Sequence, residues 1–363
     1  MSLYIKLRTA IKQNQWLYAG YKIVSSKELR QGFWDARTSL KTKKQMFREL
    51  SLLKHYWGCI PLHYFRYKLY AQNLSDEELK DFIPPYFFYV KYCAKIFKDI
   101  DNEYFDNKLN LYYEFKKKGI STVPVIAVFD SLSRLFYNPD SKKVIQEQEL
   151  LSQLNDNEKF FLKPIDGQGG YGIIVLKRKD GVVTYNGNTI SSIISLLGNA
   201  TYVVQKGLIQ RDDLMRINSS SVNTLRIVTK RIEGKYMVKA CVMRIGRNGK
   251  DIDNSAQGGL SVQINVDNGH FYPTATAEHG GGVILNHPDS GFCFKGEILS
   301  GWQEIKIQLE KYASLIPELP EIAWDVALTK DGVVIIELNT GYGIDHLQCC
   351  CGGMRRKLEV FPQ

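Results

Sequence analysis

The chain has 363 residues, a formal net charge of +10, 44% hydrophobic residues and 24% charged residues. These values are typical of a soluble, folded protein. No run of about 18 apolar residues occurs, and the first residues lack the apolar core of a signal peptide, so we expect neither a membrane span nor secretion. The seven cysteines have no paired spacing and predict reduced thiols, which indicates a cytoplasmic protein.

Residues 1–100 carry the whole positive excess, with 18 Lys plus Arg against 8 Asp plus Glu, and 20 of the 43 aromatic residues. Apolar residues recur there at helical spacing, and we predict helices that break near Pro61 and Pro84. Ser75, followed by three acidic residues, predicts a helix cap. Two interpretations remain open: the aromatics form a core beneath solvated lysines, or a basic aromatic surface contacts nucleic acid, anionic lipid headgroups or a polyanionic substrate. Among the functional options we favour a membrane surface or a partner.

After residue 100 the pattern becomes alternating, and we place a boundary near Asp101. The sequence predicts a helix ending before Gly119, a strand beyond Pro124, hairpin strands from residue 159 onward and a helix over 189–198. We therefore predict an α+β protein in three parts: a helical region 1–100, a part 101–205 with a glycine hairpin, and a part 206–363.

A glycine-rich stretch separates two predicted strands. Lys163 lies on the first strand, and four glycines follow between residues 167 and 172. A P-loop would place the lysine after the glycines at the start of a helix, so this order differs. Glycines let backbone N–H groups approach phosphate oxygens while a lysine supplies positive charge, and a purely structural turn is the alternative.

The segment Glu321–Gly343 predicts a second hairpin with a turn around Lys330. Glu337 and Asn339 point the same way because side chains alternate along a strand. If Thr329 pairs with Val333, Asp325 lies opposite Glu337. Carboxylate and amide oxygens in an apolar hairpin suit Mg²⁺, which bridges nucleotide phosphates, so the two hairpins together predict a nucleoside triphosphate site.

With these motifs the sequence resembles the ATP-grasp superfamily, and most closely the sugar-transfer-associated ATP-grasp family of exopolysaccharide and capsule biosynthesis. The resemblance implies a nucleotide held between two α+β subdomains and the cofactors ATP and Mg²⁺. It assigns ATP contacts to two lysines and to the glycine hairpin: Lys108, Lys163, Gly167, Gln168, Gly169 and Gly170.

The same resemblance assigns the adenine hinge to Gln205, where the family usually has glutamate, and to Lys206 and Leu208. Asp212 falls where a ribose-binding carboxylate is expected. The metal positions fall on Asp325, Glu337 and Asn339.

Arg226 and Arg244 lie in apolar strands, where a guanidinium needs an anionic partner. They form either structural salt bridges or, together with Lys163, the catalytic cations of an acyl-transfer step. The resemblance then implies an ATP-dependent carboxylate-amine ligase that forms an acylphosphate. The partners would be small-molecule or glycan carboxylates and amines. The alternatives are a kinase acting on a sugar hydroxyl and a non-catalytic nucleotide-binding scaffold. We do not expect nucleic acid as a partner.

Overall fold

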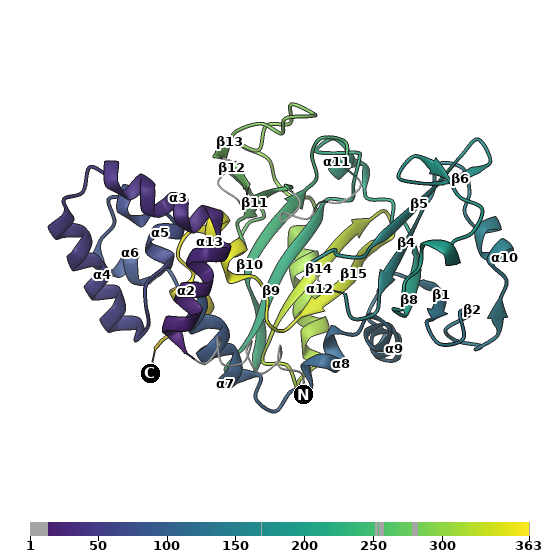
Figure 1. The fold of residues 1–363 in the computed structure, drawn as a ribbon, viewed down its shortest axis with the longest axis horizontal. Helices are drawn as coiled ribbons and strands as arrows, with labels where there is room; N and C mark the ends of the chain where they lie inside the picture. The colour runs from purple at the N-terminus through teal and green to yellow at the C-terminus, as the bar shows by residue number, and fades with distance from the viewer. Residues whose placement is uncertain (1–13, 168, 251–252, 254–257, 278–281, 363) are drawn as a thin grey trace.

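The computed structural model describes residues 14–362 except 168, 251–252, 254–257 and 278–281. Three parts follow one another along the longest axis: a helical region, a seven-stranded sheet in the middle and an eight-stranded sheet at the far end (Figure 1). All pairings between the described strands are antiparallel, so the predicted α+β class is confirmed. Within the described residues, no helix is long and apolar enough to cross a bilayer.

The eight-stranded sheet has the order β3-β2-β1-β8-β4-β5-β6-β7. Its strands are β1 (Val125–Asp130), β2 (Leu135–Tyr137), β3 (Val144–Ile145), β4 (Lys159–Pro164), β5 (Ile174–Lys179), β6 (Val182–Tyr185), β7 (Asn188–Thr189) and β8 (Tyr202–Lys206). Helix α10 (Glu147–Ser152) joins β3 to β4. Buried residues such as Phe129, Phe160 and Val204 form the core of this sheet.

The seven-stranded sheet has the order β13-β12-β11-β10-β9-β14-β15. Its strands are β9 (Thr224–Ile232), β10 (Lys235–Ile245), β11 (Leu260–Ile264), β12 (Phe271–Ala277), β13 (Val283–Ile284), β14 (Glu321–Thr329) and β15 (Gly332–Asn339). Four helices pack with this sheet: α8 (Asn102–Asp106), α9 (Lys108–Lys118), α11 (Asp212–Met215) and α12 (Trp302–Ser314). Phe115 of α9 and Leu309 of α12 share its buried core.

The region before residue 100 is helical, as predicted. Its elements are α2 (Gln15–Ser25), α3 (Lys27–Asp35), η1 (Ala36–Thr38), α4 (Lys43–Trp57), α5 (His63–Arg66), η2 (Leu69–Ala71), α6 (Asp76–Lys80), the π-helical η3 (Phe87–Cys93) and α7 (Ala94–Ile96). The helices break around Pro61 and Pro84: α4 ends at Trp57, with Gly58 as a left-handed C-cap, before Pro61, and α6 ends at Lys80 before Pro84. Ser75 caps α6, as predicted, and Glu78 completes a capping box with it.

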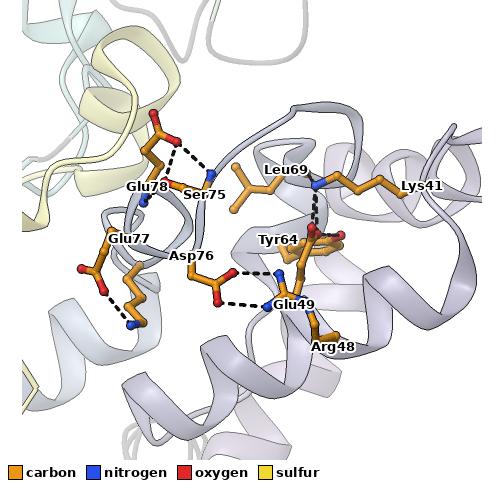
Figure 2. A network of polar contacts seen from close by, with 10 residues as sticks. Lys41, Arg48, Glu49, Tyr64, Leu69, Ser75, Asp76, Glu77 and Glu78 are labelled. Atoms are coloured by element: carbon orange, nitrogen blue, oxygen red, sulfur yellow. Dashed lines mark hydrogen bonds and ion pairs between the residues drawn. The ribbon is translucent and has the colours of Figure 1, made fainter.

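A buried carboxylate holds this region together (Figure 2). Glu49 of α4 accepts hydrogen bonds from Lys41 Nζ at 2.9 Å and from the Tyr64 hydroxyl at 2.5 Å. Lys41 Nζ also donates to the carbonyl oxygen of Leu69 at 3.1 Å. A buried charge is costly unless it is paired, so this network fixes the loop before α4 and the segment after α5.

The C-terminal tail packs on the same helices. It forms α13 (Ile344–Cys351) and α14 (Arg355–Leu358), whose apolar residues share a core with Trp57 and Phe88. The side-chain amide of Gln348 accepts from Ile83 N at 2.7 Å and donates to Ile83 O at 2.9 Å. Many aromatics of the first hundred residues are thus core residues.

One predicted element is wrong. In place of a helix over 189–198, Thr189 ends β7 and the residues after it form only the 3₁₀ turn η4 (Ile194–Leu196). The Glu147 carboxylate accepts hydrogen bonds from the backbone N–H groups of Ile193 and Ile194, and Ser192 donates to it as well. Serine and β-branched residues are weak helix formers, so packing and this carboxylate decide the local structure.

Candidate active site

A cavity of about 430 Å³ opens where the two sheets face each other. Residues of α9, β4, the glycine hairpin and β8 line one part of it, and residues of β9, β10, β14 and β15 line the other. Concave sites between subdomains are common places for ligands. Most of the predicted site residues lie at this cavity.

Lys108 is the first residue of α9, which Asn107 caps by accepting hydrogen bonds from Leu109 N and Asn110 N. The Lys108 ammonium donates to the carbonyl oxygen of Gly167 and lies 3.8 Å from Glu337 Oε1. The predicted helix and its glycine C-cap at residue 119 are confirmed. Lys108 thereby joins the glycine hairpin of one sheet to an acidic residue of the other.

Lys163 lies on β4 and lines the same cavity. The pKa of its ammonium is lowered, first by burial and then by the neighbouring positive charge of Lys108, while Glu337 and Asp325 act in the opposite direction. The charges of β4, α9, β14 and β15 therefore influence one another inside this cavity.

The glycine hairpin joins β4 to β5. Gly167, Gly169, Gly170 and Tyr171 line the cavity, and Gln168 lies outside the described residues. Gly169 has φ 63° and Gly170 has φ 77°, values that L-residues with side chains rarely adopt. Glycine is therefore required for this backbone path.

The hinge residues lie at the end of β8. Gln205, Lys206 and Leu208 line the cavity, and Gln205 is buried. Among the described residues, its Oε1 atom has no hydrogen-bond partner. A buried acceptor without a partner is costly, so the site favours a ligand that brings a donor.

Asp212 lies elsewhere. It is the first residue of α11, is exposed and is not among the described residues that line the cavity. The lining residues on either side of it are Leu208 to Gln210, Met215 and Ser219 to Val222. The ribose role of Asp212 remains a prediction.

The β14–β15 hairpin places Asp325 directly opposite Glu337, and both line the cavity. The expected pairing of Thr329 with Val333 is wrong, because Thr329 pairs with Gly332. A β-bulge between Asp325 and Val326 then shifts the register by one residue and restores the facing carboxylates.

Arg226 and Arg244 both contact Asp325. Arg226 Nε donates to Asp325 Oδ1 at 2.5 Å, and Arg244 lies 2.9 Å from Asp325 Oδ2. Burial opposes ionisation of Asp325, but the two guanidiniums outweigh it and lower the pKa of this carboxyl to about 2. Of the two arginines, the described lining includes Arg244 and not Arg226.

Asp253 is a lining residue that the sequence reasoning did not identify. Its Oδ2 accepts from the backbone N–H of Thr224 at 3.1 Å and from the Thr224 hydroxyl, and it lies 3.9 Å from Arg244 Nε. Burial raises the pKa of Asp253, with Arg244 acting against that shift. The acidic run around residue 251, next to two glycines, was the available signal.

Asp325 and Glu337 fit a Mg²⁺ ion by their chemistry. Mg²⁺ binds through one or two carboxylates together with phosphate oxygens, and each carboxylate oxygen that accepts from an arginine keeps a second lone pair. Among the described residues, no group of three or more His, Cys, Asp or Glu is arranged to hold a metal ion. Asn339 is not in the described lining, and its buried amide nitrogen lacks a partner among the described residues, so its metal role remains a prediction.

Residues 88–360 match the family described as sugar-transfer associated ATP-grasp. No curated protein matches the chain.

Solved structures give matches of low sequence identity. D-alanyl-alanine synthetase A from Vibrio cholerae is 13% identical over 70% of this chain and 61% of that one, with a TM-score of 0.41. D-alanine-D-alanine ligase from Helicobacter pylori is 14% identical over 71% and 59%, with a TM-score of 0.37. N5-carboxyaminoimidazole synthetase from Staphylococcus aureus, complexed with ADP, is 11% identical over 72% and 52%, with a TM-score of 0.38. The chain spans less than two thirds of the length of these proteins. The family match covers most of the present sequence, and the chain therefore belongs to the sugar-transfer associated ATP-grasp family.

Proposed function

We propose that this protein is an ATP-dependent carboxylate-amine ligase. One observation carries the proposal: Lys108 and Lys163 on one side and Asp325 and Glu337 on the other line a single cavity beside the glycine hairpin. Two ammonium groups and two carboxylates that line one cavity are suited to a triphosphate with its divalent cation. Family membership supports the same nucleotide.

In the first step the γ-phosphate accepts a carboxylate. A substrate carboxylate oxygen attacks the γ-phosphorus, the bond to the β,γ-bridging oxygen breaks, and ADP leaves. Lys108, Lys163 and the N–H groups of the glycine hairpin balance the negative charge that otherwise repels the attacking carboxylate. When Mg²⁺ is bound at Asp325 and Glu337, it supplies further positive charge to the phosphates.

In the second step an amine nitrogen attacks the acyl carbon and the bond to the phosphate oxygen breaks. Phosphate leaves with the proton that the nitrogen loses, and an amide forms. Arg244 is the lining arginine and is suited to hold the oxyanion of the tetrahedral intermediate. Arg226 acts as a positioning residue, because it fixes Asp325, which in turn contacts Arg244. Closure of the glycine hairpin would exclude water, which otherwise hydrolyses the acylphosphate.

The family match supports a class of substrate. The sugar-transfer association supports a uronic acid or amino acid that becomes part of a surface polysaccharide such as a capsule. Because the reaction consumes ATP, we place it on the cytoplasmic side of the cell.

The test is ATP turnover of the purified protein against a panel of sugar acids crossed with amino acids and amino alcohols. A ligase releases phosphate only when a carboxylate and an amine are both present. A stable phosphoester formed without an amine would instead show a kinase. Turnover that survives both Lys163→Met and Glu337→Gln would overturn the proposed site. The matched control is Lys330→Ala, which changes an exposed lysine on the β14–β15 hairpin that carries Glu337.

A further inference from the structure

Helices α2, α3 and α4 carry large apolar side chains that are exposed. Trp16 is 66% exposed, Val24 78%, Trp34 60% and Phe47 75%. Between residues 14 and 103 of the described chain, the exposed large apolar side chains all belong to α2, α3, α4 and the segment that joins α3 to α4. We call this set the N-terminal apolar surface: Trp16, Leu17, Tyr21, Ile23, Val24, Trp34, Leu40 and Phe47.

Helix α2 turns its apolar residues outward. Leu17, Tyr21 and Val24 are spaced by four and three residues, so they share one face of the helix. All three are exposed, while Ala19 is the buried residue of this helix. An ordinary surface helix has the opposite arrangement, with its apolar stripe facing the core.

Positive charge surrounds these side chains. Residues 14–57 contain nine Lys plus Arg against three Asp plus Glu. The Arg37 guanidinium lies 4.0 Å from the centre of the Trp34 ring, and Lys54 Nζ lies 5.9 Å from that of Trp16. Lys43 and Lys44 are exposed and lie one helical turn before Phe47.

The combination of exposed aliphatic side chains, tryptophans and positive charge favours one kind of binding partner over others. A second copy of the chain would bring the same positive excess and would be repelled. Nucleic acid would gain from aromatic rings by stacking, but Leu17, Val24 and Leu40 cannot stack on bases. A bilayer with anionic headgroups uses all three classes, because aliphatic side chains enter the acyl boundary, tryptophan stays at the headgroups and lysine attracts anionic lipid.

We propose that the N-terminal apolar surface binds the surface of an anionic membrane. The surface shares no residue with the cavity lining, whose described residues begin at Lys108. In Figure 1 these helices form one end of the molecule, beyond the seven-stranded sheet. The membrane contact therefore leaves the cavity open to soluble substrates. The two proposals can be tested separately, because they involve different residues.

Tryptophan emission gives a specific readout. The chain has five tryptophans, and Trp57, Trp302 and Trp324 are buried. Acrylamide therefore reaches Trp16 and Trp34 first. Adding vesicles of phosphatidylcholine mixed with phosphatidylglycerol to the full chain should shift the emission to the blue and protect these two residues from the quencher. Vesicles of phosphatidylcholine alone should do neither.

Variants separate the two contributions. Trp16→Ser with Trp34→Ser should remove the protected emission and weaken sedimentation with anionic vesicles by about tenfold or more. Lys43→Gln with Lys44→Gln should weaken it by roughly fivefold for each charge, while removing positive charge from a helix N-terminus does not destabilise α4. Leu132→Ser, an exposed leucine in the β1–β2 turn, is the matched control and should bind as the wild type does.

Several results would overturn the proposal. They are no sedimentation with anionic vesicles, equal binding to neutral vesicles, and undiminished binding of the two double variants. Self-association that the double tryptophan variant abolishes would show a second copy in place of lipid. Unchanged thermal unfolding of each variant establishes that a loss of binding comes from the surface and not from misfolding.

Discussion

Lys108 Nζ lies 3.8 Å from Glu337 Oε1, although the two residues are far apart in the sequence and belong to α9 and β15. This contact brings a helix start and a hairpin strand to the same cavity. Burial raises the pKa of Glu337, while Lys108 acts against that shift. The pair is thus an acidic and a basic group that each lack full solvation and are available to a charged ligand.

Removing either charge of this pair should reduce catalysis. Lys108→Met and Glu337→Gln keep the approximate size of each side chain, and we expect kcat/KM for ATP to fall by about a hundredfold in each. Steady-state ADP release measures the effect. Wild-type kinetics in both variants would exclude the pair from the reaction, and Lys330→Ala serves as the control for an exposed lysine.

Asp325 should matter for folding as well as for activity. Asp325→Asn leaves Arg226 and Arg244 buried without their carboxylate, and breaking such a buried pair costs about 3 to 5 kcal/mol. Urea unfolding monitored by circular dichroism measures this loss. The exposed Asp331→Asn on the same hairpin should change stability little, and a variant of Asp325 as stable as the wild type would contradict the proposed charge network.

Gln205 should contribute to nucleotide binding rather than to chemistry. Its buried Oε1 lacks a partner among the described residues, so Gln205→Leu should raise the KM for ATP by about tenfold with little change in kcat. Gln205→Glu keeps an acceptor oxygen and should retain more of the affinity. A fall in kcat at unchanged KM would contradict a binding role.

His63 should make stability depend on pH. Burial lowers the pKa of this imidazole from 6.5 to about 3, and among the described residues neither ring nitrogen has a partner. The unfolded chain therefore binds a proton that the folded chain does not. The contribution of His63 is fully present above about pH 6.5 and is lost as the pH falls below it.

The free energy of unfolding should consequently fall by about 1 kcal/mol between about pH 6 and pH 5 because of this residue. His63→Leu should show a correspondingly flatter profile, whereas the exposed His55→Leu should retain the wild-type slope. Equal slopes in all three proteins would contradict a lowered pKa of His63 in the folded state.

The sequence predicted the hairpins well because alternation and turn residues are local signals. The β14–β15 hairpin and the helix from Lys108 to Gly119 are confirmed, and the facing of Asp325 and Glu337 is correct. The predicted pairing of Thr329 with Val333 was wrong. The β-bulge that brings Asp325 opposite Glu337 depends on packing between strands and has no clear sequence signal.

Other features depend on contacts that sequence reasoning does not give. The turn at Ile194 depends on Glu147, and the position of Asp253, which lies between β10 and β11, depends on hydrogen bonds from Thr224 of β9. Arg226 and Arg244 were expected to need an anionic partner. The identity of that partner, Asp325, follows only from the registers of β9 with β14 and of β10 with β9. The division into residues 1–100, 101–205 and 206–363 remains a prediction.

Calorimetric titration of a non-hydrolysable ATP analogue with Mg²⁺ into the wild type and the Lys163→Met variant tests the central claim most directly. If Lys163, Lys108, Asp325 and Glu337 hold one triphosphate, the wild type binds in a magnesium-dependent way and the variant loses about a hundredfold in affinity. Equal binding by both proteins, or binding by neither, would contradict the account.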